Sequence, residues 1–320
     1  MTGETIDVRI NQMRYEAATI VSLELVPVDG GDLPAFTAGA HIDLILTDKI
    51  RRSYSLLNDQ GERDRYVVGI HRYPDSRGGS RIVHERLRVG QVIKISPPVN
   101  DFPLDESARH IVLLAGGIGV TPILCMLRRL QAEGKSWELH YGARNSTAAA
   151  FLSEIKEIAK DDPSRIHMFF DDENPGKYID IPAIVAAQPD DAHFYCCGPV
   201  PMLDAYEKAT KDLPRERVHM EYFSAKEEVA REGGFDLVLQ KSGKHITVPP
   251  GKTILDVLIE NKVNVSFSCS EGICGTCETA VIEGVPDHRD QFLTDEEKAS
   301  NKLIMVCCSG AKSAKLVLDL

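Results

Sequence analysis

The sequence predicts a multidomain fold in three parts. An antiparallel β-barrel comes first, an α/β domain built on a parallel sheet follows, and a smaller strand-rich domain holds the C-terminal cysteines. Two changes of pattern along the 320 residues support this division. Short alternating strands give way near residue 105 to strands that alternate with helices, and a polar stretch near residue 230 precedes a new group of strands.

Composition and charge narrow the possible functions. The chain is 43% hydrophobic and 27% charged, and its net charge of −11 disfavours nucleic acid or an anionic membrane as a partner. The first residues lack the apolar segment of a secretion signal, and no run of about 18 apolar residues occurs. We therefore expect a cytoplasmic protein and a monomer. In a reducing cytosol its eight cysteines are better explained as metal ligands or catalytic groups than as disulfides.

Residues 1–105 show the signals of an antiparallel barrel or sandwich. β-branched residues alternate with polar ones, and Gly, Pro and Asp separate the segments. The expected strands are "TIVSLELVPV", "HIDLILT", "RSYSLL", "RYVVGIHRY" and "QVIKISPP".

Residues 106–226 read as an α/β domain. The stretch "HIVLLAGGIGVTPILCMLRRL" (110–130) combines an apolar strand, a glycine turn and an amphipathic helix, for which Thr121 is the expected N-cap and Pro122 the first helical residue. Buried-type strands recur at 137–144, 166–172 and 192–199, with helical stretches such as 149–160 between them. This alternation predicts a parallel sheet with helices on both faces.

The C-terminal part begins after a polar, glycine-ended linker at 227–234. Residues 235–320 start with the strands of "FDLVLQKSGKHITVPP" and continue with a helix in "TILDVLIENK". The cysteine-rich loop follows this helix.

The cysteine spacing is the strongest chemical signal in the chain. Cys269, Cys274 and Cys277 are separated by four and two residues, and a further cysteine pair begins 29 residues later. Zinc sites instead pair two short knuckles or add histidines at fixed spacing. Three clustered cysteines and one distant one are the pattern of plant-type [2Fe–2S] ligands.

Spacing alone leaves the fourth ligand open between Cys307 and Cys308. In plant-type ferredoxins, which this loop resembles, the fourth ligand is followed by one residue and then a small Ser or Ala. The resemblance therefore implies Cys307 as the ligand and Cys308 as a packed thiol. Gly272 and Gly275 would let the loop wrap closely, so that backbone N–H groups can point at the cluster sulfurs.

The glycine turn at 116–122 is a weaker signal. Gly116, Gly117, Gly119 and Thr121 can place a pyrophosphate at a helix N-terminus, but the third glycine of the dinucleotide fingerprint is absent. A tight strand-to-helix turn without a ligand would look the same.

A second turn, "YCCGPVPML" (195–203), should lie at the same edge of the sheet. The two turns together resemble the ferredoxin–NADP⁺ reductase superfamily. That resemblance implies that Cys197, Gly198 and Pro199 line a nicotinamide pocket and that Cys196 points into the sheet.

The stretch "RRSYSLLN" (51–58) resembles the flavin motif of the same superfamily. The resemblance implies that Arg52 meets the flavin phosphate, Tyr54 packs on the ring system and Ser55 lies near the reactive N5 atom, with Ser53 inside the same motif. A phosphate suits a bidentate donor, and a planar ring suits an aromatic face. Without that resemblance, the stretch would be a short barrel strand with an exposed arginine.

Gly78, Gly79 and Ser80 open a helix-like segment and offer free N–H groups and a hydroxyl to one compact dianion. This looks like the FMN form of the fold. FAD members also stack an aromatic residue on adenine, and the sequence shows no clear platform for one. We therefore expect FMN rather than FAD.

The order of flavin barrel, nucleotide domain and C-terminal β-grasp ferredoxin resembles the phthalate dioxygenase reductase family across essentially the whole chain. Within that family the sequence most resembles the reductases of carnitine monooxygenase, vanillate demethylase and phenoxybenzoate dioxygenase, with a slight preference for the carnitine type. The resemblance implies hydride transfer from NADH to FMN, then single electrons through [2Fe–2S] to a transiently bound Rieske non-haem iron oxygenase.

Three further residues bear on the nicotinamide. By resemblance Phe223 lies close to the flavin where nicotinamide enters, although a core aromatic is an equal alternative. Asp171 or its neighbour could bond the adenosine ribose, whereas Arg144 could bind a 2′-phosphate, and we expect NADH on balance. The expected catalytic residues are thus Ser55, Cys197 and Phe223.

Two rival functions remain open. A redox-carrier or sensor module would not turn over NADH, and a reductase of a diiron monooxygenase would usually carry FAD and place its ferredoxin first. The ten histidines show no metal-binding spacing and are expected on the surface or in the core.

Overall fold

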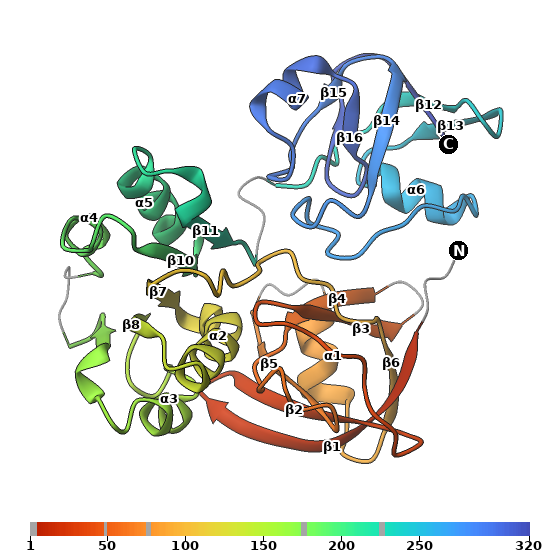
Figure 1. The fold of residues 1–320 in the computed structure, drawn as a ribbon. Coiled ribbons are helices and arrows are strands. Elements are labelled where there is room, and N and C mark those ends of the chain that lie inside the picture. The colour runs from red at the N-terminus through yellow and green to blue at the C-terminus, as the bar shows by residue number, and fades with distance from the viewer. Residues whose placement is uncertain (1–4, 48–49, 75–77, 174–177, 224–227) are drawn as a thin grey trace. The chain divides into compact units, whose positions relative to one another are not determined.

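The computed structural model describes residues 5–47, 50–74, 78–173, 178–223 and 228–320. The chain divides into two compact units, one spanning residues 3–223 and the other essentially residues 224–320 (Figure 1). Each unit is described by itself. Among the described residues, no helix has both the length and the apolar composition needed to cross a bilayer.

The first half of the larger unit is an antiparallel barrel, as predicted. Its sheet has the order β4-β3-β6-β1-β2-β5. The two edges of the sheet meet just after β4, where Leu57 N donates to Val67 O at 3.0 Å. Helix α1 (Gly79–Arg86) follows β5. The strands are β1 (Ile6–Ala17), β2 (Ile20–Pro27), β3 (His41–Thr47), β4 (Ile50–Ser55), β5 (Tyr66–His71) and β6 (Val92–Ile95).

Strand β1 is the barrel strand that the sequence did not predict. Its register against β2 shifts between Ile10 and Gln12 and again between Tyr15 and Ala17. Such bulges interrupt the two-residue alternation by which a strand is recognised.

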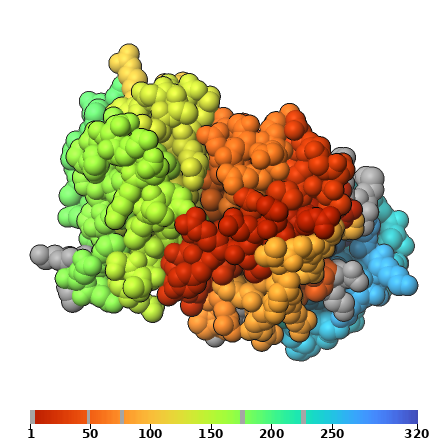
Figure 2. Space-filling view, turned by 90° about the horizontal axis from the view of Figure 1, so that it is seen from below, coloured from red at the N-terminus to blue at the C-terminus, as the bar shows by residue number. Residues whose placement is uncertain are grey.

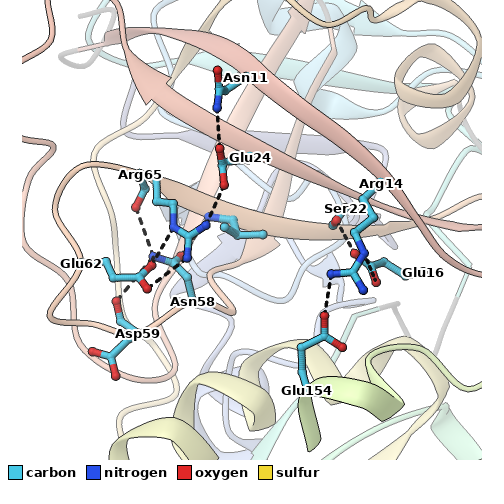
Figure 3. Close-up of polar contacts among 11 residues, drawn as sticks. Asn11, Arg14, Glu16, Ser22, Glu24, Asn58, Asp59, Glu62, Arg65 and Glu154 are labelled. Atoms are coloured by element: carbon cyan, nitrogen blue, oxygen red, sulfur yellow. Dashed lines mark hydrogen bonds and ion pairs between the residues drawn. The ribbon is translucent and has the colours of Figure 1, made fainter. Parts of the chain in front are cut away.

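Ion pairs join the barrel strands to one another and to the nucleotide-binding part (Figure 3). Arg65 contacts Glu24 at 2.7 Å and Glu62 at 2.9 Å within the barrel. Arg14 on β1 reaches Glu154 on helix α3 (Leu152–Ile158) at 2.8 Å. Figure 2 shows the red and orange barrel lying directly against the yellow-green segments of the same unit.

The second half of the larger unit is built on a five-stranded parallel sheet, in the order β11-β10-β7-β8-β9. Ile111 and Leu113 of β7 face the core that contains helix α2, whereas Val112 packs with Tyr206 of helix α5 on the opposite face. The prediction of helices on both faces is confirmed. The strands are β7 (His110–Gly116), β8 (Ser136–Ala143), β9 (Ile166–Phe170), β10 (His193–Cys197) and β11 (Val218–Glu221). The remaining helices are α2 (Val120–Ala132), α4 (Ile181–Ala186), α5 (Val200–Thr210) and the 3₁₀ turns η1 (Gly117–Gly119), η2 (Pro163–Arg165) and η3 (Arg215–Arg217).

The start of α2 differs from the prediction. Gly119 is the N-cap, and Thr121 lies inside the first turn, where its hydroxyl donates to Ile118 O at 3.0 Å. The predicted capping role of Thr121 and first-turn start at Pro122 are wrong. The 3₁₀ turn η1 (Gly117–Gly119) before α2 winds the chain early, so that its helical hydrogen bonds replace a side-chain cap.

The smaller unit folds around a five-stranded sheet in the order β13-β12-β18-β14-β16. Strand β12 pairs in parallel with β18, so the first and last strands of the unit are neighbours, as in the predicted β-grasp fold. Thr253 caps helix α6 with a capping box. The elements are β12 (Phe235–Leu239), β13 (Lys244–Val248), α6 (Ile254–Glu260), β14 (Glu278–Glu283), β15 (Pro286–Asp287), α7 (Asp295–Ser300), β16 (Leu303–Met305), β17 (Gly310–Ala311) and β18 (Lys315–Leu318).

Part of the segment expected as a linker packs onto this unit. Ala230 is buried, and its backbone N–H donates to Cys308 O at 2.8 Å. The Gly251 N–H donates to Arg231 O at 2.7 Å. The start of that segment, at residue 227, lies outside the described residues.

Candidate functional site

The N-terminus of α1 meets Arg52 of β4. A Cβ atom placed on Gly79 would lie 2.6 Å from Arg52 Cγ, so only glycine lets the arginine stem cross the start of the helix. Ser80 Oγ is buried there and has no hydrogen-bond partner among the described residues. The first turn of α1 carries no acidic residue. An orphaned hydroxyl, helix N–H groups and a guanidinium fit a phosphate, so the residues present suit the phosphate of FMN.

The remaining residues of the flavin motif, Ser53, Tyr54 and Ser55, follow one another along β4. Burial raises the pKa of the Tyr54 phenol to about 12, although Arg52 opposes that shift, so the ring stays neutral. Ser53 Oγ donates to Asp43 Oδ1 at 2.7 Å and is therefore engaged inside the barrel. Ser55 is buried at the end of the strand.

The two predicted turns of the nucleotide-binding part touch through their backbones. A Cβ atom on Gly119 would fall on the Cys197 carbonyl, and one on Gly116 would lie 2.6 Å from Pro199 Cδ. These two glycines are thus required by contact between the turns. Gly117, at φ +53° with open space around its Cα, is the glycine left for close approach of a ligand.

Cys196 and Cys197 project onto opposite faces of the parallel sheet, because successive side chains of a strand alternate between its faces. Both thiols are fully buried, and burial raises the pKa of each far above its usual value. Neither is a thiolate nucleophile at neutral pH. They can contribute shape and packing to a pocket.

Glu221 is the functional candidate that sequence reasoning missed. It ends β11 directly beside Cys197 on β10, and Ser55 of the barrel hydrogen-bonds to its carboxyl group. Burial raises the pKa of Glu221 to about 8, and Asp101 adds to the shift while Ser55 opposes it. Its Oε2 atom finds no partner within the described parts of the chain. Ser55, Cys197 and Glu221 therefore meet where the barrel joins the carboxyl edge of the parallel sheet.

The segment "EYF" (221–223) contains Glu221, but the sequence alone does not mark this residue as functional. An acidic residue at a strand end is ordinarily solvated, and only the barrel strand placed against it makes it buried. Phe223, which the sequence favoured instead, is partly buried and packs against the larger core.

The residues expected at the adenosine end lie farther along the same edge. Arg144 and Asp171 follow the neighbouring strands β8 and β9, and the Asp171 N–H donates to Ala143 O at 3.2 Å. Both side chains are exposed. Asp172 accepts a hydrogen bond from Asn145 at 3.0 Å, so it is already engaged. Thr121 is buried, its methyl group lies against Gly69 of β5, and its hydroxyl donates to Ile118 O at 3.0 Å.

The four predicted iron ligands come together in the smaller unit. Hydrogen bonds from the thiols of Cys274 and Cys307 hold the pKa of the Cys269 thiol far below its usual value, and Cys307 does the same for Cys277. Four cysteine thiols in mutual contact are the donor set of a [2Fe–2S] cluster. The loop reaches this shape through positive φ angles at Gly272 and Gly275.

Cys308 lies under the loop. Its Sγ atom is 3.7 Å from both Met305 O and Ser309 Oγ, and a Cβ atom on Gly272 would collide with it. The geometry favours Cys307 as the ligand, because Cys307 is the member of the pair that contacts Cys269 and Cys277.

Comparison with known proteins gives two matched families. Residues 113–208 match the family described as an oxidoreductase NAD-binding domain, and residues 237–312 match that of the 2Fe-2S iron-sulfur cluster binding domain.

Full-length relatives cover the whole chain. The tetrachlorobenzoquinone reductase of Sphingobium chlorophenolicum is 50% identical over 99% of this chain and 98% of its own length. The phenoxybenzoate dioxygenase subunit beta of Ectopseudomonas oleovorans is also 50% identical, over 100% and 98%. The structure of phthalate dioxygenase reductase, described as modular for electron transfer from pyridine nucleotides to [2Fe-2S], matches with a TM-score of 0.84 and 39% identity over 99% and 98%.

The slight preference for the carnitine type was wrong. The carnitine monooxygenase reductase subunit of Escherichia coli (strain K12) is 37% identical, against 50% for the phenoxybenzoate relative.

The cofactor prediction is confirmed: the protein is an electron-transfer oxidoreductase that uses FMN, a [2Fe–2S] cluster and NADH. With identities of this size across its full length, and with the predicted order of barrel, nucleotide-binding part and ferredoxin, the chain belongs to the phthalate dioxygenase reductase family.

Proposed function

We propose that this protein is the reductase component of a two-component Rieske non-haem iron oxygenase. The observation that carries the proposal is the group of four cysteine thiols in a chain that also holds the phosphate cradle of Arg52 and Ser80. A flavin enzyme that only reduced a small molecule would need no cluster. A chain that also carries a cluster is suited to deliver electrons singly to another protein.

The proposed division of labour follows the sequence boundaries: a flavin barrel at 1–105, a nucleotide domain at 106–226, a linker at 227–234 and the ferredoxin at 235–320. A flavin held there would supply the chemistry that links a two-electron hydride donor, NADH, to a one-electron [2Fe–2S] acceptor. The residues of the protein position the flavin. Arg52, Gly79 and Ser80 hold the phosphate, Tyr54 packs on the ring, and Ser55 stands beside the reacting position.

On the nicotinamide side, Cys197, Gly198 and Pro199 shape the pocket and Phe223 borders the entry. Gly117 lets the pyrophosphate approach the turn, and Asp171 takes the ribose. Glu221 holds its proton at neutral pH because its pKa is raised to about 8. A neutral carboxyl group in the pocket avoids repelling electron-rich groups and can donate a hydrogen bond to the bound ring.

The exit side offers a surface for a partner. Phe292 is 48% exposed and its ring lies against Gly275 of the cysteine loop. An exposed aromatic beside an electron-transfer site suits a transient contact with another protein. Relatives named as a dioxygenase subunit and as a monooxygenase reductase subunit support an oxygenase as that partner. We further propose that the reductase works as a cytoplasmic monomer.

The test is anaerobic titration with NADH followed by turnover with a Rieske oxygenase. We expect flavin bleaching, then the signal of a reduced [2Fe–2S] cluster in electron paramagnetic resonance, then reduction of the oxygenase. Cys274→Ser should retain flavin bleaching and lose oxygenase reduction. Full-rate oxygenase reduction by that variant would refute the cluster route, and extraction of FAD instead of FMN would favour a diiron-type reductase.

A second function has one specific observation in its favour, namely the 50% identity to a tetrachlorobenzoquinone reductase. A quinone could take two electrons and two protons, one delivered as hydride equivalent and one from solvent, to give the hydroquinone while NADH becomes NAD⁺. Such a reaction could proceed at the flavin alone. The Cys274→Ser variant separates the two functions, because quinone reduction at the flavin should survive the loss of the cluster.

A further inference from the structure

Three side chains with metal-binding chemistry lie together on one face of the parallel sheet, away from every residue placed in the electron path. Glu138 and His140 alternate along β8 and therefore share a face, and His167 on β9 is the direct register partner of His140. One donor atom from each of the three lies within 4.8 Å of the others. Spacing in the sequence does not reveal this group, because strand register brings it together.

We propose that Glu138, His140 and His167 bind one divalent transition-metal ion. Two imidazoles and a carboxylate are a donor set that Zn²⁺ uses with water in the fourth position. His167 is exposed, so an ion can enter from solvent and keep a water ligand. Donor atoms on one zinc ion lie at most roughly 4 Å apart. The His140 and His167 rings are stacked with their centroids 4.5 Å apart, so His167 has to turn out of this stack to direct a nitrogen at the shared ion.

A second observation points to a ligand. His140 is only 6% exposed, and its Nε2 atom is 2.8 Å from Glu138 Oε1. An ion shared with Glu138 binds Nε2, the nitrogen that faces the carboxylate, so the ion displaces the Nε2 proton and takes the place of this hydrogen bond. Nδ1 lies on the other side of the ring and is buried with no partner in the described structure.

The surroundings hold the carboxylate in a ligating state. Gln188 Nε2 donates to Glu138 Oε1 at 2.7 Å, and Gln188 Oε1 is in turn 3.1 Å from His110 Nε2. Such outer hydrogen bonds orient metal ligands.

The consequence would be structural. Strand β9 is an edge of the sheet, and Asp171 follows it. An ion shared by Glu138, His140 and His167 would tie β9 to β8 in the register shown. Occupancy should then raise the melting temperature of the larger unit.

The test is equilibrium dialysis of the holoprotein against Zn²⁺, with zinc and iron counted per chain by mass spectrometry. We expect one zinc per chain with the iron content unchanged, which shows that the [2Fe–2S] site was not displaced. His167→Gln, a change at an exposed position, should abolish this zinc and the zinc-dependent rise in melting temperature. The matched control is His245→Gln, an exposed histidine of the other unit, which should bind like the wild type.

A further variant distinguishes a built site from a chance pair of histidines. Gln188→Leu leaves all three ligands in place but removes the hydrogen bond to Glu138, so zinc affinity should fall roughly tenfold to a hundredfold. The proposal is overturned if the wild type takes up no zinc beyond that of His167→Gln. It is equally overturned if Gln188→Leu binds zinc as tightly as the wild type.

Discussion

The chain contains two Cys-Cys pairs, and the structure uses them in opposite ways. Cys196 and Cys197 lie in an extended strand, so their thiols point to opposite faces of a sheet and enter two different cores. Cys307 and Cys308 lie in a turn, and both belong to the core of the smaller unit. In the strand, burial in apolar surroundings raises both thiol pKa values. In the turn, the Cys307 thiol contacts thiols of the cysteine loop, whereas Cys308 packs beneath that loop.

The difference shows that the dipeptide itself carries no chemistry. Backbone conformation decides which way each thiol points, and the segments around it decide whether it meets metal-binding groups or hydrocarbon. Four predictions test this comparison, from the largest expected effect to the smallest.

Removing one thiol of the second pair should separate its two roles. Cys307→Ala should abolish the [2Fe–2S] cluster, seen as loss of its visible absorption and of its paramagnetic signal after reduction. Cys308→Ala should keep the cluster and lose on the order of 1 kcal/mol of stability, the usual cost of a small core deletion. If Cys308→Ala lost the cluster and Cys307→Ala kept it, the ligand assignment would be reversed.

The first pair borders Glu221, whose buried carboxyl group should make stability depend on pH. Its pKa is raised to about 8 in the folded state from 4.5 when unfolded. Between these values the unfolded chain has released the proton and the folded chain has kept it, so stability falls as pH rises from about 5 to about 8. The total loss is on the order of a few kcal/mol, since one pKa unit corresponds to about 1.4 kcal/mol.

Glu221→Gln removes this titration. Melting temperatures of the wild type and the variant should therefore diverge as pH rises from 5 to 8, with the variant the more stable at pH 8. Parallel curves over that range would show that Glu221 is already ionised in the folded protein.

The contact between Cys308 and the loop can be tested through Gly272. Gly272→Ala should weaken the cluster loop for two reasons: strain at φ +74°, about 1 kcal/mol, and a collision with Cys308 Sγ. Gly243→Ala is the matched control, because its φ of +66° is similar and nothing lies within 4 Å of the new Cβ. The measurement is the denaturant midpoint for loss of the cluster absorption.

Adding Cys308→Ala to each glycine variant completes the test. The second change should recover part of the Gly272→Ala loss and none of the Gly243→Ala loss. Equal effects in both backgrounds would mean that Cys308 does not support the loop.

These comparisons also explain what the sequence could predict. The three clustered cysteines were predictable because their spacing is local, and the β and α patterns of the first two parts were predictable because burial imposes their periods. Glu221 and the Glu138–His140–His167 group were not, since strand register and the placement of the barrel bring those residues into their surroundings. Thr121 was misread because a 3₁₀ turn starts the helix before it. Arg52 and Ser80 were each expected at the flavin phosphate, and the structure adds that Arg52 lies against Gly79, the residue before Ser80.

The smallest effect should come from the first cysteine pair. Cys196→Ala and Cys197→Ala each delete one buried sulfur atom and should cost about the same stability, on the order of 1 kcal/mol. Their effects on chemistry should differ, because Cys197 shares a sheet edge with Glu221 and Gly119 whereas Cys196 faces the core beneath α5. Stopped-flow reduction of the flavin by NADH should slow in Cys197→Ala and stay at the wild-type rate in Cys196→Ala. If both variants slowed it equally, general packing of β10 rather than the position of Cys197 would govern the pocket, and the two thiols of this strand would be functionally alike.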